Sequence, residues 1–96
     1  MQRYEIQNTI SSLKPELKKR FSVKQLSLFG SYAREQAHQN SDIDILVDFE
    51  ITPDLLTFIE LEDFLSQKLG KPVDLVPMRK LKPVLKKQIL HEAIAL

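Results

Sequence analysis

Two aspartates two positions apart, Asp42 and Asp44, are the residues in this sequence best suited to chemistry. If residues 43–49 form a strand, both side chains leave the same face, with Cα atoms about 6.6 Å apart at roughly 3.3 Å per residue. Magnesium prefers oxygen ligands and is usually held by one or two carboxylates together with substrate phosphates. The spacing therefore predicts a site for a magnesium-bound nucleotide, although two such acids can also be simply solvated.

A glycine-led turn precedes this pair. Residues 24–29 form a short, partly alternating apolar run, which predicts a strand that ends at Gly30. Backbone N–H groups at the start of a helical turn attract phosphate, and glycine permits close approach. Ser31 adds a hydroxyl and Arg34 a positive charge, so Gly30, Ser31 and Arg34 are predicted to bind a triphosphate. Arg34 can alternatively pair with Glu35 or another surface acid.

Asp74 lies in an otherwise apolar run, residues 73–76, where an acid is unfavourable unless it faces solvent or a partner charge. If this run forms a strand beside the strand of Asp44, Asp74 completes a three-carboxylate site. It can then hold the catalytic metal and accept the proton of an attacking hydroxyl, while metal ions stabilise the departing pyrophosphate. That chemistry is in-line nucleotidyl transfer.

The elements that must position these residues follow from periodicity. Apolar residues at helical spacing predict a first helix, which Pro15 is expected to break or bend, leaving a helix and a short turn; the apolar residues are Ile6, Ile10, Leu13 and Leu17. Thr52 is predicted to cap a second helix that Gly70 ends. Its predicted buried stripe is Leu55, Phe58, Leu61, Leu65 and Leu69.

Residues 73–76 then predict a short strand that Pro77 stops, and Pro83 opens a basic amphipathic helix. Lysines on such a helix usually just form its solvent-exposed face. The order helix, strand, turn, strand, helix, strand, helix predicts an α/β (α+β) fold in which helices pack on a small mixed sheet. A length of 96 residues predicts one domain, residues 1–96.

Composition excludes several classes of function. Hydrophobic residues make up 43% and charged residues 28%, which is typical of a globular protein. A net charge of +1 gives no overall field for stable nucleic-acid binding. The sequence has no cysteine, as in a reducing compartment such as the cytoplasm, and no apolar run approaches the roughly 18 residues needed to span a membrane.

Residues 30–34 (Gly-Ser-Tyr-Ala-Arg) and 41–47 (Ser-Asp-Ile-Asp-Ile-Leu-Val) resemble the G-S-x-A-R-G and S-D-x-D-L-x-V blocks of a known superfamily. This is the nucleotidyltransferase superfamily of DNA polymerase beta and kanamycin nucleotidyltransferase, and the likeness is greatest to its short, minimal prokaryotic members. A leading helix, Asp74 in a V-D-L-V strand and a closing basic helix with residues 91–93 are also similar. The resemblance covers nearly the whole chain.

The resemblance implies a nucleotidyltransferase fold and an antitoxin of a toxin–antitoxin pair. Such an antitoxin transfers AMP from ATP to a tyrosine of a HEPN ribonuclease toxin and so silences it. The implied catalytic and metal-binding residues are Asp42, Asp44 and Asp74, with two magnesium ions, and the implied nucleotide-binding residues are Gly30, Ser31 and Arg34.

One departure from the family pattern concerns Glu35, which stands where glycine is usual and brings a negative charge near the predicted phosphate site. Two alternatives stay open, of which the first is motivated by Glu35. The chain can be a weak or inactive binding module that neutralises its partner by steric contact. It can also be a nucleotidyltransferase that acts on a small molecule or an RNA end.

Overall fold

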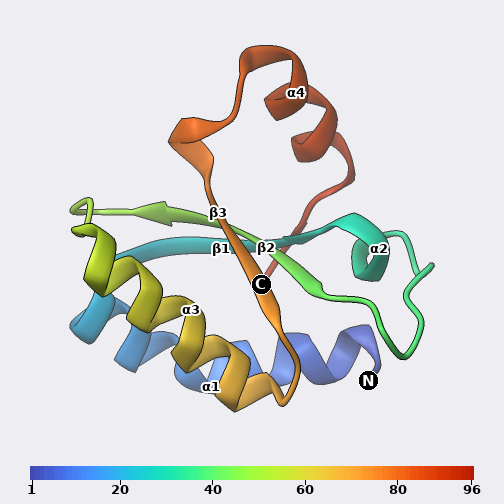
Figure 1. Cartoon of the computed structure of the whole chain (residues 1–96), viewed down its shortest axis with the longest axis horizontal. Helices are drawn as coiled ribbons and strands as arrows, with labels where there is room; N and C mark the ends of the chain where they lie inside the picture. Colours follow the sequence, from blue (N-terminus) through green and yellow to red (C-terminus); the bar gives the residue numbers. More distant parts are fainter.

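One mixed sheet organises the chain, in the strand order β3-β2-β1-β4 (Figure 1). The computed structural model describes residues 1–96. The strands are β1 (Val23–Phe29), β2 (Ile43–Phe49), β3 (Val73–Pro77) and β4 (Ile94–Ala95). β1 runs antiparallel to both β2 and β4, whereas β2 and β3 are parallel. The predicted mixed sheet packed by helices is confirmed.

The two faces of the sheet have different surroundings. Helices α1 (Arg3–Phe21) and α3 (Leu55–Leu69) lie together against one face, and α4 (Pro83–Glu92) stands on the other side (Figure 1). Alternate β2 residues join the core beneath α1 and α3, namely Ile43, Ile45 and Val47. Since side chains alternate along a strand, Asp44 must leave β2 on the opposite face. The acids of the site therefore lie on the face that α1 and α3 do not cover.

Helix α1 continues through Pro15 without interruption, so the predicted break near Lys14 is wrong. The missing N–H of an interior proline costs about 3 kcal/mol. Four buried side chains outweigh that cost at roughly 1.5–3 kcal/mol each; they are Ile6, Ile10, Leu17 and Phe21. Tertiary packing therefore decides the length of this helix.

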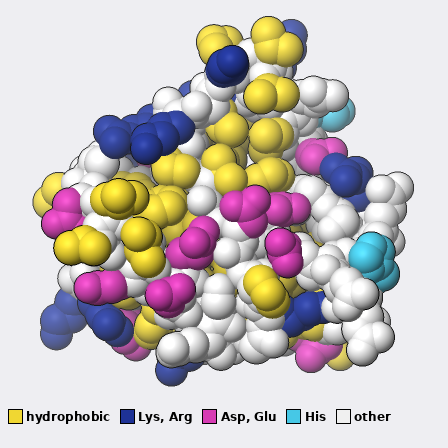
Figure 2. All heavy atoms as spheres, in the orientation of Figure 1, with side chains coloured by type: hydrophobic (Ala, Val, Ile, Leu, Met, Phe, Trp, Pro, Cys, Tyr) yellow, Lys and Arg dark blue, Asp and Glu magenta, His cyan; other side chains and the backbone are white.

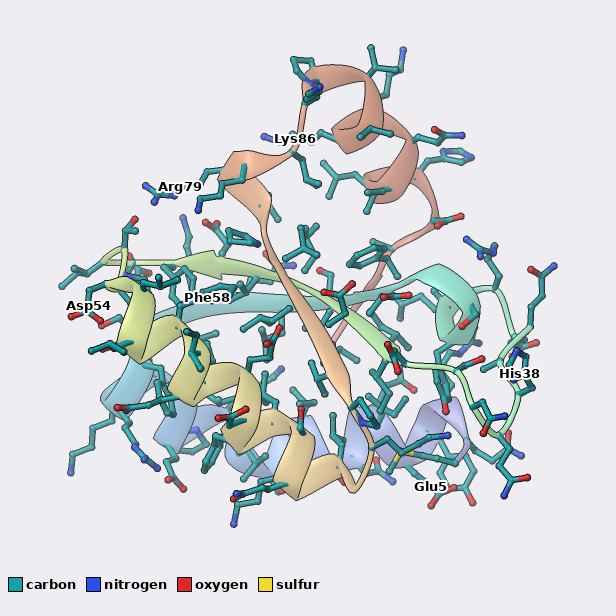
Figure 3. The ribbon with its side chains drawn as sticks, viewed as in Figure 1. Glu5, His38, Asp54, Phe58, Arg79 and Lys86 are labelled. Atoms are coloured by element: carbon teal, nitrogen blue, oxygen red, sulfur yellow. The ribbon has the colours of Figure 1, made fainter.

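Helix α3 begins two residues later than predicted. Asp54 is the N-cap, and its carboxylate accepts a 2.8 Å hydrogen bond from the Thr57 N–H, so Thr52 is not the cap. Leu55 is 72% exposed, so the prediction that it belongs to the buried stripe is wrong. Leu61, Leu65 and Leu69 are buried as expected. Figure 3 shows Asp54 at the start of the helix and Phe58 one turn further along.

Gly70 ends α3 in the left-handed region, with φ +70°, as predicted. Helix α4 begins at the predicted Pro83, yet none of its residues is fully buried. The chain then returns to the sheet as β4, which was not predicted, and the Leu96 N–H donates to the Leu26 carbonyl at 2.9 Å. Two strand residues are too few to show periodicity. No helix has the length and apolar character needed to cross a membrane.

Candidate active site

Asp44 and Asp74 occupy paired positions on the parallel strands β2 and β3. Paired residues on neighbouring strands project from the same face of a sheet. Asp42 precedes β2 by one residue and lies two positions from Asp44, with its side chain exposed. Figure 2 shows acidic side chains gathered near the centre of the visible face. The structure thus brings the three predicted acids to one region.

The electrostatics of Asp44 reflect this grouping. Partial burial, and then the negative charges of Asp74 and Asp42, raise the pKa of Asp44 above its ordinary value of 3.8. The nearby positive charge of Arg34 opposes the increase. Because neighbouring carboxylates repel, a cation between them would be stabilising.

The turn at Gly30 lies directly against Asp44. Gly30 has φ +71°, a conformation that other residues adopt at a cost. A Cβ atom at this position would lie 2.9 Å from Asp44 Cγ and would collide with Oδ2. Glycine is therefore required both by the backbone angle and by the close approach of the carboxylate.

Helix α2 (Gly30–Ala33) is the short helical turn expected after β1. Its end is closed by hydrogen bonds from the Arg34 N–H to the Gly30 carbonyl at 3.1 Å and from the Gln36 N–H to the Ser31 carbonyl at 2.8 Å. These bonds fix the backbone that carries Ser31, whose side chain is half-buried. The predicted nucleotide-binding turn is thus compact and held beside the acids.

Arg34 is engaged by side chains of the protein. Its Nη1 lies 3.1 Å from Oε1 of Glu92, at the end of α4, and its Nε donates to Oε1 of Gln36, also at 3.1 Å. The acid that pairs with it is therefore Glu92 and not Glu35. Because the Arg34 side chain remains 46% exposed, an anion can still approach it.

Glu35 adopts φ +58°, the left-handed conformation for which glycine is favoured. Its carboxylate pairs with Arg3 of α1 at 3.1 Å, and its side chain is 70% exposed. Arg3 also donates to the Ala33 carbonyl at 3.0 Å. The backbone thus keeps the shape expected of glycine, and the negative charge is paired with Arg3.

The donor set at the three acids suits magnesium, which binds oxygen ligands. No three His, Cys, Asp or Glu side chains are close enough to enclose an ion by themselves. The three carboxylates are nevertheless close enough to interact, because Asp74 and Asp42 add to the effect of burial in raising the pKa of Asp44. Magnesium is commonly completed by phosphates and water, so a closed cage of three carboxylates is not required.

Glu92 was missed as a residue of the site. It lies 58 positions from Arg34 in the sequence, and its pairing depends on how α4 packs beside α2. A glutamate near the end of a basic helix gives no signal that it will contact a distant arginine. His38 and His91 are both exposed, and neither belongs to the acidic group.

Comparison with known proteins identifies the family. Residues 10–96 match the nucleotidyltransferase domain family. The protein adenylyltransferase MntA of Thermococcus cleftensis is 48% identical over 90 residues, which cover 94% of this chain and 91% of that protein.

Two solved structures agree with this match. The chain is similar to a crystal structure of a toxin–antitoxin with AMP-PNP, with a TM-score of 0.75, 35% identity, and coverage of 92% of this chain and 69% of that chain. It is also similar to a chain in the structure of the tri-AMPylated Shewanella oneidensis HEPN toxin in complex with MNT antitoxin. There the TM-score is 0.68, the identity 29%, and the coverage 99% and 71%. The chain belongs to the nucleotidyltransferase domain family.

Proposed function

We propose that this protein transfers AMP from ATP to a tyrosine hydroxyl of a HEPN ribonuclease toxin and so silences the toxin. The observation that carries the proposal is the pairing of Asp44 with Asp74 on adjacent strands, with the Gly30 turn packed against Asp44. The similarity to a protein adenylyltransferase and to an MNT antitoxin in complex with an AMPylated HEPN toxin supports it.

In the proposed reaction the tyrosine oxygen attacks the α-phosphorus of ATP. A bond forms between these two atoms, the bond from the α-phosphorus to the α,β-bridging oxygen breaks, and pyrophosphate leaves. Asp74 accepts the hydroxyl proton as general base. Asp42, Asp44 and Asp74 would hold two magnesium ions, which supply charge stabilisation for the attacking and leaving oxygens.

The Gly30 turn has the role of binding the triphosphate. Gly30 allows the nucleotide close to the backbone, Ser31 offers a hydroxyl donor, and Arg34 offers a charged donor. Glu35 does not preclude this role, since its carboxylate pairs with Arg3.

Two further assignments belong to the proposal. A single cluster of 17 buried hydrophobic residues supports treating residues 1–96 as one minimal nucleotidyltransferase domain. A cytoplasmic location is favoured by the lack of cysteine and by the need for ATP.

The direct test is incubation of the protein with a HEPN toxin, magnesium and ATP labelled at the α-phosphate. We expect label on the toxin, at tyrosine, and release of pyrophosphate. Asp42→Asn should abolish labelling. The matched control is Asp48→Asn, which removes an acid of β2 outside the three-acid group and should label normally. Absence of label with the wild-type protein would refute the proposal.

A binding module that neutralises its partner by contact alone is the second candidate. The pairing of Arg34 with Glu92 is the observation that favours it, because a carboxylate of the protein itself occupies the cation that would bind the triphosphate. One experiment distinguishes the two candidates. Cells that express the toxin together with the Asp44→Asn variant of this protein should die if catalysis is needed. If they survive and the toxin carries no AMP, contact alone is sufficient.

A further inference from the structure

β3, the strand that carries Asp74, lies at the edge of the sheet and has only β2 beside it. The N–H groups on the outer side of an edge strand lack strand partners and need other acceptors. If these groups were left free, the strand could shift, and a slip of one residue would turn Asp74 to the opposite face.

Two side chains of α3 bind this outer side of β3. The Leu75 N–H donates to Oε2 of Glu62 at 2.9 Å, and the Val73 N–H donates to Oγ of Ser66 at 3.0 Å. Both bonds are partly buried. The two acceptors lie one helical turn apart and therefore share one face of α3.

The two bonds flank Asp74 on either side in the sequence. Ser66 is itself fixed, because its hydroxyl donates to the carbonyl of Glu62 at 2.9 Å. On the inner side, β3 pairs with β2 so that Asp74 lies opposite Asp44. The backbone of Asp74 is thus held between β2 and α3.

We propose that Glu62 and Ser66 are positioning residues that hold β3 in the register that places Asp74 beside Asp44. Glu62 and Ser66 act only through the backbone of β3. This inference rests on the proposed AMP transfer, in which Asp74 takes part.

The test compares Glu62→Ala, Glu62→Gln and the control Asp63→Ala, which removes a neighbouring exposed acid of α3. AMP transfer to the HEPN toxin and exchange of the Leu75 amide with solvent are both measured, well below the melting temperature of each protein. Since displacement of a catalytic group by about 1 Å can cost on the order of 100-fold, we expect Glu62→Ala to lower kcat at least about tenfold. The KM for ATP should change less than about twofold, because the Gly30 turn is untouched.

Glu62→Gln keeps an oxygen acceptor and should restore most of the kcat, and Asp63→Ala should match the wild type. The Leu75 amide should exchange faster in Glu62→Ala alone. Ser66→Ala, a smaller change, should lower kcat in the same direction and speed exchange of the Val73 amide. An unchanged kcat in Glu62→Ala, or an equal loss in Glu62→Gln, would overturn the proposal. If the wild-type protein transfers no AMP, the proposed function fails, and unchanged exchange at Leu75 would then refute the positioning role separately.

Discussion

The guanidinium of Arg34 lies 3.1 Å from the carboxylate of Glu92, so the arginine next to the predicted phosphate turn is tied to the end of α4. The Glu92 side chain is 31% exposed and that of Arg34 46% exposed. Partly exposed ion pairs of this kind are worth roughly 0–1 kcal/mol. A triphosphate can therefore displace Glu92 from Arg34 at a modest cost.

Glu92→Gln should lower the KM for ATP by up to about fivefold, because it removes the carboxylate that competes for Arg34. The measurement is the ATP dependence of AMP transfer, with Gln88→Ala on the exposed surface of α4 as the control. A rise in the KM would show the reverse relationship, in which Glu92 orients Arg34 toward the nucleotide.

Gly30→Ala and Gly70→Ala form a matched pair, since the two glycines have φ +71° and +70°. Both variants should lose roughly 1–2 kcal/mol of unfolding free energy, the cost of a left-handed residue. Nothing lies within 4 Å of a Cβ at Gly70, whereas a Cβ at Gly30 would displace the Asp44 carboxylate. Gly30→Ala alone should therefore lose AMP transfer, on the order of 100-fold. Denaturant unfolding measures the loss of stability in both variants, and the rate of AMP transfer measures the loss of activity in Gly30→Ala.

Equal activity of these two alanine variants would mean that the carboxylate of Asp44 can move without consequence. A much larger loss of stability in Gly70→Ala than in Gly30→Ala would contradict the difference in surroundings seen in the structure.

Asp44→Asn should stabilise the protein at neutral pH in the absence of magnesium. The folded-state pKa of Asp44 is raised, chiefly by burial and then by Asp74 and Asp42. Its ionisation therefore favours the unfolded state, and wild-type stability is lost as pH rises from 3.8 through the raised pKa. The difference in melting temperature between the variant and the wild type should grow across that range and then become constant.

Magnesium should narrow this difference by stabilising the wild type more than Asp44→Asn. Thermal melts from pH 3 to 8, with and without magnesium, provide the measurement. A difference that is largest in acid would contradict the sign of the shift.

Glu35→Gly and Glu35→Ala separate the backbone of this position from its side chain. Both variants lose the ion pair with Arg3, but only alanine keeps a Cβ at φ +58°. Glu35→Gly should be the more stable of the two by about 1 kcal/mol. Urea unfolding compares them directly, and equal stabilities would argue against a left-handed residue 35 in solution.

Local patterns in the sequence predicted most of the fold and the grouping of the acids. Alternation in residues 43–49 predicted which side chains share a face of β2, and Gly70 predicted the end of α3. The first residue of α3 was harder to predict, because Thr52 and Asp54 are both able to cap a helix. Only the folded chain decides between them.

Three other wrong or missing predictions, at Pro15, Glu92 and β4, depend on contacts between residues far apart in the sequence. Pro15 lies inside α1 because the helix packs against the sheet and α3. Glu92 reaches Arg34, and β4 reaches β1, only after the rest of the chain has folded. Such contacts leave no periodic pattern in the sequence.

The parallel pairing of β2 and β3 has a consequence for how activity develops during folding. Parallel neighbours need a crossover connection, here α3, so Asp74 reaches Asp44 only when that helix has docked. A nascent chain that stops before residue 73 contains the glycine turn and two acids but lacks Asp74, the proposed proton acceptor. AMP transfer should therefore be recovered late in refolding and in one step. The time course of its recovery would then report when the sheet is complete.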